Sequence, residues 1–218
     1  MASSIVHLAI TNELVKKIEF TDANRLKFGA IVVDAGIKGE GQRNAHLKVF
    51  VNDGTQKTYD FDRYREEFRE KMLTDDLYMG YYLHLVQDAL YRKYVYVTHC
   101  WNPHIPGNIE RLYKDYGIVN QYVINKYQLK NDIVITEDFE AEELSKISDF
   151  DTSRFMKNLK DYFEPVKEEP IFFFTKEMSD KFIRDAVDFC TAEIDKIRKG
   201  ETGIDMYEYA WKTAEPLA

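Results

Sequence analysis

The segment Gly80-Tyr81-Tyr82-Leu83-His84-Leu85-Val86-Gln87-Asp88 governs the interpretation of this chain. Most of its residues are apolar, which is typical of a buried helix, yet it carries a histidine and an aspartate four positions apart. Residues at positions i and i+4 lie on one face of an α-helix. An unpaired polar group in a protein core is costly, so His84 and Asp88 need a common partner. A bound metal ion would be such a partner.

Helix-capping side chains and apolar residues at helical spacing predict more helices on both sides of this segment. Ser3 or Ser4 can cap a first helix that carries His7 in its first turns. Thr21 and Asp22 can cap a second helix that ends near Asp34. Further helices are expected at residues 62–73, 74–97, 109–127, 151–163 and 175–198.

Two stretches break the helical pattern. Residues 35–45 are glycine-rich and polar, which predicts a loop, and residues 47–60 contain the turn Asn52-Asp53-Gly54, which favours a small hairpin. The regular alternation of helices and strands that marks α/β folds is missing. We therefore expect an all-α, single-domain, multi-helix bundle over residues 1–218, with room for one small hairpin near residues 47–60.

Composition narrows the classes of protein to consider. The net charge of −8 argues against a binder of duplex nucleic acid, which needs a positive surface. Only two cysteines, Cys100 and Cys190, occur, so a disulfide framework is not expected and a reducing cytoplasm fits. No apolar run is long enough to span a membrane and no signal peptide is visible. We expect a cytoplasmic protein.

Three upstream residues, His7, Asp34 and His46, could join His84 and Asp88 at a common site. Imidazole and carboxylate ligands suit zinc, and also iron or manganese. Such a set could hold one ion, or two if an aspartate bridges them, and a pair of ions can clamp a phosphoryl group and activate water.

Each of these residues also has an ordinary structural interpretation. His84 could be a hydrogen-bonded core histidine, and its pairing with Asp88 could be a simple ion pair within the helix. Asp34 could be a helix-end residue, and His46 could lie in a solvated loop. The His-x-x-x-Asp spacing alone arises often by chance, so the hypothesis depends on the five side chains converging.

The motifs have a familiar order. Ser3-Ser4-Ile5-Val6-His7 resembles a Ser-x-x-x-His opening, residues 28–36 resemble a Gly-Ala-x-x-Pro-Asp segment, Ala45-His46-Leu47 stands where Ser-His-Phe is usual, and residues 80–88 resemble a Gly-Tyr-x-x-His-x-x-x-Asp helix. Over residues 3–90 the chain thus resembles the zinc-dependent phospholipase C family in its broad sense. That family is an all-α group of metal hydrolases shared by bacterial phospholipases C and single-strand-specific nucleases, and the chain is most similar to its small bacterial members.

The resemblance implies a set of metal ligands. Asp34, His46, His84 and Asp88 would hold one metal, and His7 would join a neighbouring metal with Asp88 as the bridge. The secreted members hold a third metal with extra histidines just after the long helix. Here Arg92 and Lys93 stand in that place, and His99 and His104 follow with unlike spacing. One or two zinc ions are therefore expected.

Asp115 lies on an aromatic-rich helix that we expect to pack near the long one. It could complete the coordination of a metal or support a ligating histidine, or it could be a surface acid. His99 and His104 could line the pocket or be ordinary loop residues. Arg43, Lys48 and Arg92 could meet an anionic group of a substrate.

The resulting functional expectation is a metal-dependent hydrolase, of phosphoesterase type, that acts on a small phosphate-containing substrate. Metal-activated water would attack phosphorus, and Asp34 or Asp88 would accept its proton. One alternative is a non-catalytic metal-stabilised binding or regulatory protein. A helical HD-type phosphohydrolase is a third possibility, but it requires adjacent His and Asp, and the chain has no His-Asp dipeptide.

Overall fold

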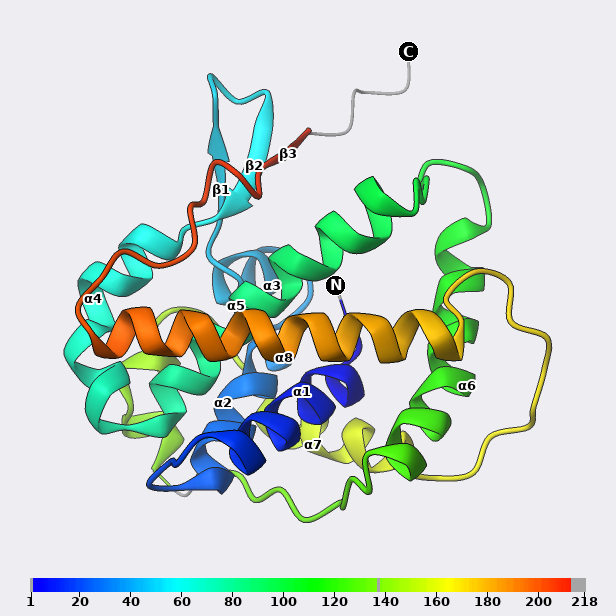
Figure 1. Cartoon of the computed structure of the whole chain (residues 1–218), viewed down its shortest axis with the longest axis horizontal. Coiled ribbons are helices and arrows are strands. Elements are labelled where there is room, and N and C mark those ends of the chain that lie inside the picture. The colour runs from blue at the N-terminus through cyan, green and yellow to red at the C-terminus, as the bar shows by residue number, and fades with distance from the viewer. Residues whose placement is uncertain (1, 137, 213–218) are drawn as a thin grey trace.

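The computed structural model describes residues 2–136 and 138–212. This part of the chain is mostly helical and carries a small three-stranded antiparallel sheet (Figure 1). The α-helices are α1 (Ser4–Lys17), α2 (Ala23–Val32), α3 (Glu40–Ala45), α4 (Phe61–Thr74), α5 (Asp76–Arg92), α6 (Asn108–Lys126), α7 (Thr152–Asp161) and α8 (Lys176–Arg198). The strands are β1 (Lys48–Val51), β2 (Gln56–Tyr59) and β3 (Trp211–Lys212), and the shorter helical segments are η1 (Val33–Ala35), the π-helix η2 (Lys93–Thr98), η3 (Phe139–Ala141) and η4 (Glu143–Lys146).

Capping side chains begin the helices where the sequence predicts. The Ser3 hydroxyl accepts a hydrogen bond from the Val6 amide at the start of α1. Asp22 accepts from two amides of the first turn of α2, and Asp75 accepts from the Leu77 amide at the start of α5. These bonds satisfy amide groups that have no carbonyl partner inside their helix.

Helix α5 is the centre of the core, and every residue from Leu77 to Ala89 is buried. A helix that is buried all round must be covered by other elements. Helices α1, α2, α4 and α8 contact α5, and α8 runs across much of the width of the molecule (Figure 1). None of the helices in the described ranges combines the length and the apolar character needed to cross a membrane.

Two glycines let α2 and α5 cross at backbone contact. A Cβ atom at Gly29 would lie 2.2 Å from the Leu77 carbonyl oxygen, and one at Gly80 would lie 2.2 Å from the Leu26 carbonyl oxygen. Both distances are far below contact distance, so no larger residue fits at either position. The crossing places the first half of α5 directly beside α2.

The structure corrects the sequence prediction in two places. Residues 35–45 were expected to form a loop, but residues 40–45 form α3, which Gly39 enters through a positive φ of 94°. A six-residue helix is too short to show a periodic apolar pattern. The helix expected at residues 74–97 ends at Arg92 as an α-helix and continues as the π-helix η2.

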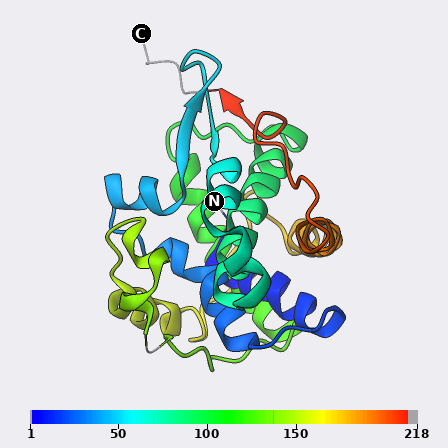
Figure 2. The same ribbon diagram turned by 90° about the vertical axis from the view of Figure 1, so that its left-hand side faces the viewer.

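The hairpin predicted near residues 47–60 is formed by β1 and β2, which pair from Lys48 with Tyr59 to Val51 with Gln56. The short strand β3 joins β2 from the far end of the chain, pairing Trp211 with Lys57. Figure 2 shows this sheet projecting from one end of the helical body. A two-residue strand has no sequence period, so β3 was not expected.

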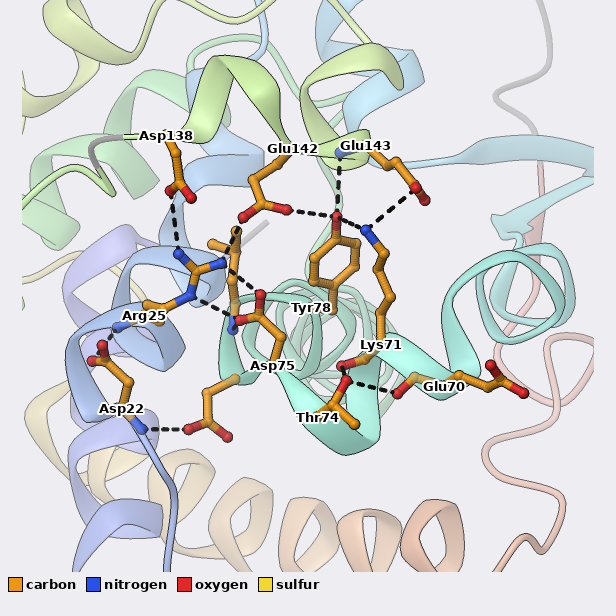
Figure 3. Close-up of polar contacts among 12 residues, drawn as sticks. Asp22, Arg25, Glu70, Lys71, Thr74, Asp75, Tyr78, Asp138, Glu142 and Glu143 are labelled. Atoms are coloured by element: carbon orange, nitrogen blue, oxygen red, sulfur yellow. Dashed lines mark hydrogen bonds and ion pairs between the residues drawn. The ribbon is translucent and has the colours of Figure 1, made fainter.

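Arg25 fastens the loop that follows α6 to the helical body (Figure 3). Its guanidinium donates to both carboxylate oxygens of Asp75, at 2.8 Å and 2.5 Å, and to Glu142 at 2.7 Å. The Tyr78 hydroxyl donates to the other oxygen of Glu142 at 2.8 Å. Side chains of α2, α5 and the segment before η4 therefore form one charged cluster.

Candidate metal centre

The five side chains that the sequence analysis singled out converge in the structure. His84 and Asp88 lie one turn apart on α5, His7 is in the second turn of α1, Asp34 is in η1, and His46 directly follows α3. The side chains of the three histidines and Asp88 have no exposed surface, and that of Asp34 is 13% exposed. Four separate elements thus deliver three imidazoles and two carboxylates to one buried place.

Hydrogen bonds fix the orientation of each imidazole ring. The Nδ1 atom of His84 lies 2.8 Å from the Ala30 carbonyl oxygen, and that of His46 lies 2.8 Å from the Gln42 carbonyl oxygen. The Nδ1 atom of His7 lies 2.8 Å from Gln87 Oε1. These oxygens can only accept, so each Nδ1 carries the proton. In the neutral ring, Nε2 is then left with a lone pair.

The three Nε2 atoms face one another and the two carboxylates. His46 Nε2 and His84 Nε2 are 3.4 Å apart. Asp34 Oδ1 lies 3.7 Å from His46 Nε2 and 3.9 Å from His84 Nε2. Ligand atoms at about 2.0–2.2 Å from a tetrahedral zinc ion are separated by roughly 3.3–3.5 Å, so the observed spacings are close to those of a zinc site.

Asp88 divides its two oxygens between different histidines. Its Oδ1 lies 3.5 Å from His7 Nε2 and accepts from the Ala2 amide at 3.0 Å. Its Oδ2 lies 3.6 Å from His46 Nε2 and 3.8 Å from His84 Nε2. The buried Tyr59 hydroxyl also donates to Oδ2, at 3.3 Å. Asp88 thus directs one oxygen toward His7 and the other toward His46 and His84. A carboxylate in this arrangement can bridge two metal ions.

Acceptor atoms predominate at the centre of this group. Lone pairs of three Nε2 atoms and oxygens of two carboxylates all require a positive partner, and His7 Nε2 has no hydrogen-bond partner among the described residues. Two overlapping sets, His7 with Asp34 and His84, and His46 with His84 and Asp88, each hold their ligand atoms within 4.8 Å of one another. Orphaned acceptors of this kind are the donor set that a divalent cation takes.

Protonation states near neutral pH favour cation binding at most of these residues. Burial raises the pKa of Asp34, but the neighbouring imidazoles of His84 and His46 outweigh burial and lower it to about 2. Burial also acts to raise the pKa of Asp88, yet the adjacent His7 imidazole holds it well below its usual range. Burial lowers the pKa of His84 to about 3. Both carboxylates are therefore ionised and His84 is neutral, as metal ligands must be.

His7 behaves differently from His84. Burial lowers its pKa, but the Asp88 carboxylate, 3.5 Å from Nε2, and the nearby Asp34 carboxylate outweigh burial and raise it. Proton and metal therefore compete for this nitrogen.

Asp34 connects the cluster to solvent. Its Oδ2 accepts from the Ser4 hydroxyl at 2.8 Å, which leaves Oδ1 for the histidines. Asp34 also lines a cleft of about 540 Å³ between η1, α6 and α7. The volume is within the range of small-molecule sites. Among the five candidate ligands, Asp34 is therefore the one that lines this cleft.

Asp115 is not brought into this group. Its carboxylate accepts hydrogen bonds from the backbone amides of Phe172, Phe173 and Phe174, at 2.7–2.9 Å. The acid therefore fixes the segment before α8, and its role as a metal ligand is corrected to a structural one. His99 and His104 are exposed and lie outside both candidate ligand sets.

The residues that orient the candidate ligands were not predicted from the sequence. Gln87 was visible as a buried polar residue in an apolar segment, but its partner His7 is 80 positions away. Tyr59 lies on the hairpin, and nothing in the sequence links it to Asp88. The cations that line the cleft, Lys38 and Arg154, come from segments that meet only in the folded protein.

Comparisons with family models, with curated proteins and with solved structures found no match to this chain. Fold and site together define a mostly helical protein with a buried candidate metal centre of three histidines and two aspartates.

Proposed function

We propose that this protein is a metal-dependent hydrolase of phosphate esters. One observation carries the proposal: three imidazole lone pairs and two ionised carboxylates converge, and Asp34 among them lines an open cleft. A purely structural metal site is closed, whereas a catalytic one keeps access for water and substrate. Asp34 is partly exposed and lines the cleft, so water and substrate in the cleft can reach this candidate ligand.

The residues present fit one or two zinc ions. His46, His84, Asp34 and Asp88 would hold one ion, and His7 with the other oxygen of Asp88 would contribute to a second. The same donors accept iron or manganese. A bound cation of this kind would supply charge neutralisation at the phosphoryl oxygens and acidification of water.

The chain's own residues would divide the remaining work. Asp34 can be reached from the cleft, so it is the residue placed to accept a proton from an incoming water. Asp88 is fully buried and both its oxygens are engaged, so we assign it the role of a ligand. In the reaction, the water oxygen forms a bond to phosphorus, the bond from phosphorus to the ester oxygen breaks, and the proton ends on the leaving alcohol.

The motif resemblance supports the same assignment. The four segments that resemble the zinc-dependent phospholipase C family are the segments that supply His7, Asp34, His46, His84 and Asp88. We propose that the chain shares the helical scaffold and the ligand set of that family. Both cysteines are unpaired, which fits our proposal of a cytoplasmic enzyme.

Substrate panels with and without metal test this proposal. Protein loaded with Zn²⁺, Mn²⁺ or Fe²⁺ is assayed on 4-nitrophenyl phosphate and bis(4-nitrophenyl) phosphate, beside the Asp34→Asn variant. We expect turnover that requires metal and falls by about 10² or more in the variant. Metal-loaded protein that turns over neither ester would favour the alternative, a metal-stabilised binding or regulatory protein.

A further inference from the structure

Helix α6 carries a glycine at its middle that helix stability does not favour. Gly117 stands nine residues from each end of the helix, where glycine is less stable than alanine. Packing does not require it, because a Cβ atom built there would meet no atom within 4 Å. Gly29 and Gly80, by contrast, are forced by backbone contact. Gly117 therefore leaves a space that the protein itself does not fill.

This space belongs to the cleft that reaches Asp34. Gly117 and Asp34 both line it, so the open volume over the glycine is continuous with the access to the candidate metal centre. The floor near Asp34 is polar, since Ser4 donates to Asp34 at 2.8 Å and Ser3 donates to Asn120 at 2.6 Å.

Aromatic rings surround the space. Tyr113, Tyr116 and Tyr162 line the cleft beside Gly117. Tyr113 is 65% exposed, which is unusual for a large aromatic side chain on a helix that packs against the core, and its ring lies 5.9 Å from that of Tyr116. Exposed tyrosines beside an open cleft offer flat surfaces for a ring of the ligand.

One exposed cation at the rim can meet a phosphoryl group. Lys38 and Arg154 line the cleft together with Asp34 and Asp151, and Arg154 lies 3.6 Å from Asp151, whereas Lys38 is exposed. Serine, asparagine and charged side chains in the lining are unsuited to a lipid chain. The cleft thus combines an exposed lysine at its rim, a polar floor and tyrosine rings along its lining.

We infer that the space over Gly117 receives the organic group of the substrate, and that this group is a flat ring. The substrate class is then a small, water-soluble, ring-bearing phosphate monoester, with its phosphoryl group toward Asp34 and its ring among the tyrosines. This inference rests on the proposed function for the reaction, but the binding that it describes can be measured without turnover.

Two phosphonates separate ring recognition from phosphoryl recognition. Phenylphosphonate and methylphosphonate carry a carbon–phosphorus bond that hydrolysis does not cleave, so binding to the zinc-loaded protein can be measured by titration calorimetry. We expect phenylphosphonate to bind the natural chain at least tenfold more tightly than methylphosphonate. Gly117→Leu should weaken phenylphosphonate at least about tenfold by filling the space, and Gly117→Ala should weaken it less.

Folding and metal loading are controlled in the same experiment. Both substitutions replace a helix-interior glycine with a better helix former, so we expect unchanged zinc content and an unchanged or higher melting temperature. Lys114→Leu is the matched control, because Lys114 is exposed on the same helix and does not line the cleft. It should leave phenylphosphonate affinity unchanged.

The outcomes distinguish this inference from the proposed function. Equal affinity for the two phosphonates, no binding of either, or full phenylphosphonate affinity in Gly117→Leu would overturn the ring site. Ring-selective binding that Gly117→Leu abolishes, in a protein that hydrolyses no phosphate ester, would support the site and refute the hydrolase. Hydrolysis of 4-nitrophenyl phosphate with an unchanged KM in Gly117→Leu would support the hydrolase and refute the ring site.

Discussion

Gly29 on α2 and Gly80 on α5 each lie against the backbone of the other helix, and this contact positions the candidate metal centre. The residue after Gly29 is Ala30, and His84 is one turn after Gly80. Because the helices touch, the Ala30 carbonyl lies 2.8 Å from His84 Nδ1 and fixes that ring. The close helix crossing thus permits a hydrogen bond that orients the His84 ring, a candidate ligand.

Gly80→Ala should therefore damage both the fold and the site. A Cβ atom would clash with the Leu26 carbonyl oxygen at 2.2 Å, and forcing the helices apart should cost roughly 3 kcal/mol in the free energy of unfolding. Chemical denaturation followed by circular dichroism measures this loss. Gly117→Ala, a helix-interior glycine without close neighbours, is the control and should gain up to about 1 kcal/mol. Equal stability of Gly80→Ala and the natural chain would contradict the contact.

Gln87 should control metal affinity at His7 without touching a metal. Its Oε1 accepts the proton of His7 Nδ1, and loss of such a partner typically costs about 10–100-fold in metal affinity. Gln87→Leu should show this loss in a zinc titration with a competing indicator. Gln87→Glu keeps an acceptor at the same reach and should retain most of the affinity. If leucine and glutamate bind zinc alike, Gln87 does not orient His7.

The Arg25 cluster should make stability depend on pH in a defined direction. Burial raises the pKa of Asp75, but the hydrogen bond from Arg25 outweighs it and lowers the pKa below the ordinary value of 3.8. A lowered carboxyl pKa gives stability that is complete above pH 3.8 and is lost as pH falls through the folded-state value.

Asp75→Asn tests this dependence, since the amide cannot ionise. We expect a loss of about 1–3 kcal/mol at pH 7, and this gap to the natural chain should close as pH falls below 3.8. Asp185→Asn is the control, because its partner Lys181 lies at 2.7 Å but both side chains are more than half exposed; surface pairs of this kind contribute about 0–1 kcal/mol. A gap for Asp75→Asn that stays constant with pH would refute the assignment.

Removal of metal should destabilise the protein. A cation that binds only the folded state stabilises it by about 2.7 kcal/mol when its free concentration is a hundred times its Kd. Dialysis against a chelator should lower the melting temperature, and added Zn²⁺ should restore it. In His84→Ala the same treatment should have little effect, because a shared ligand is gone. A melting temperature that changes with neither chelator nor zinc would contradict the proposed metal centre.

The sequence predicted the mostly helical class and the convergence of five candidate ligands, because each of these residues lies in a motif or at a helix end. His46 was the hardest of them, since α3 is too short to show a helical period and the loop expected there left its position undefined. Asp115 was assigned wrongly because its partners, the amides of residues 172–174, are more than 50 positions away along the chain. Lys38 and Arg154 reach the cleft through tertiary packing alone, which a single sequence does not encode in any local pattern.

Elemental analysis joined to anomalous diffraction tests the central claim most directly. Protein purified without chelators is analysed for bound metals, and crystals are measured on both sides of the absorption edge of the metal found. The account predicts an anomalous peak within bonding distance of His46 Nε2, His84 Nε2 and carboxylate oxygens of Asp34 and Asp88. Metal-free protein that takes up no zinc, with these imidazoles turned toward other partners, would contradict it.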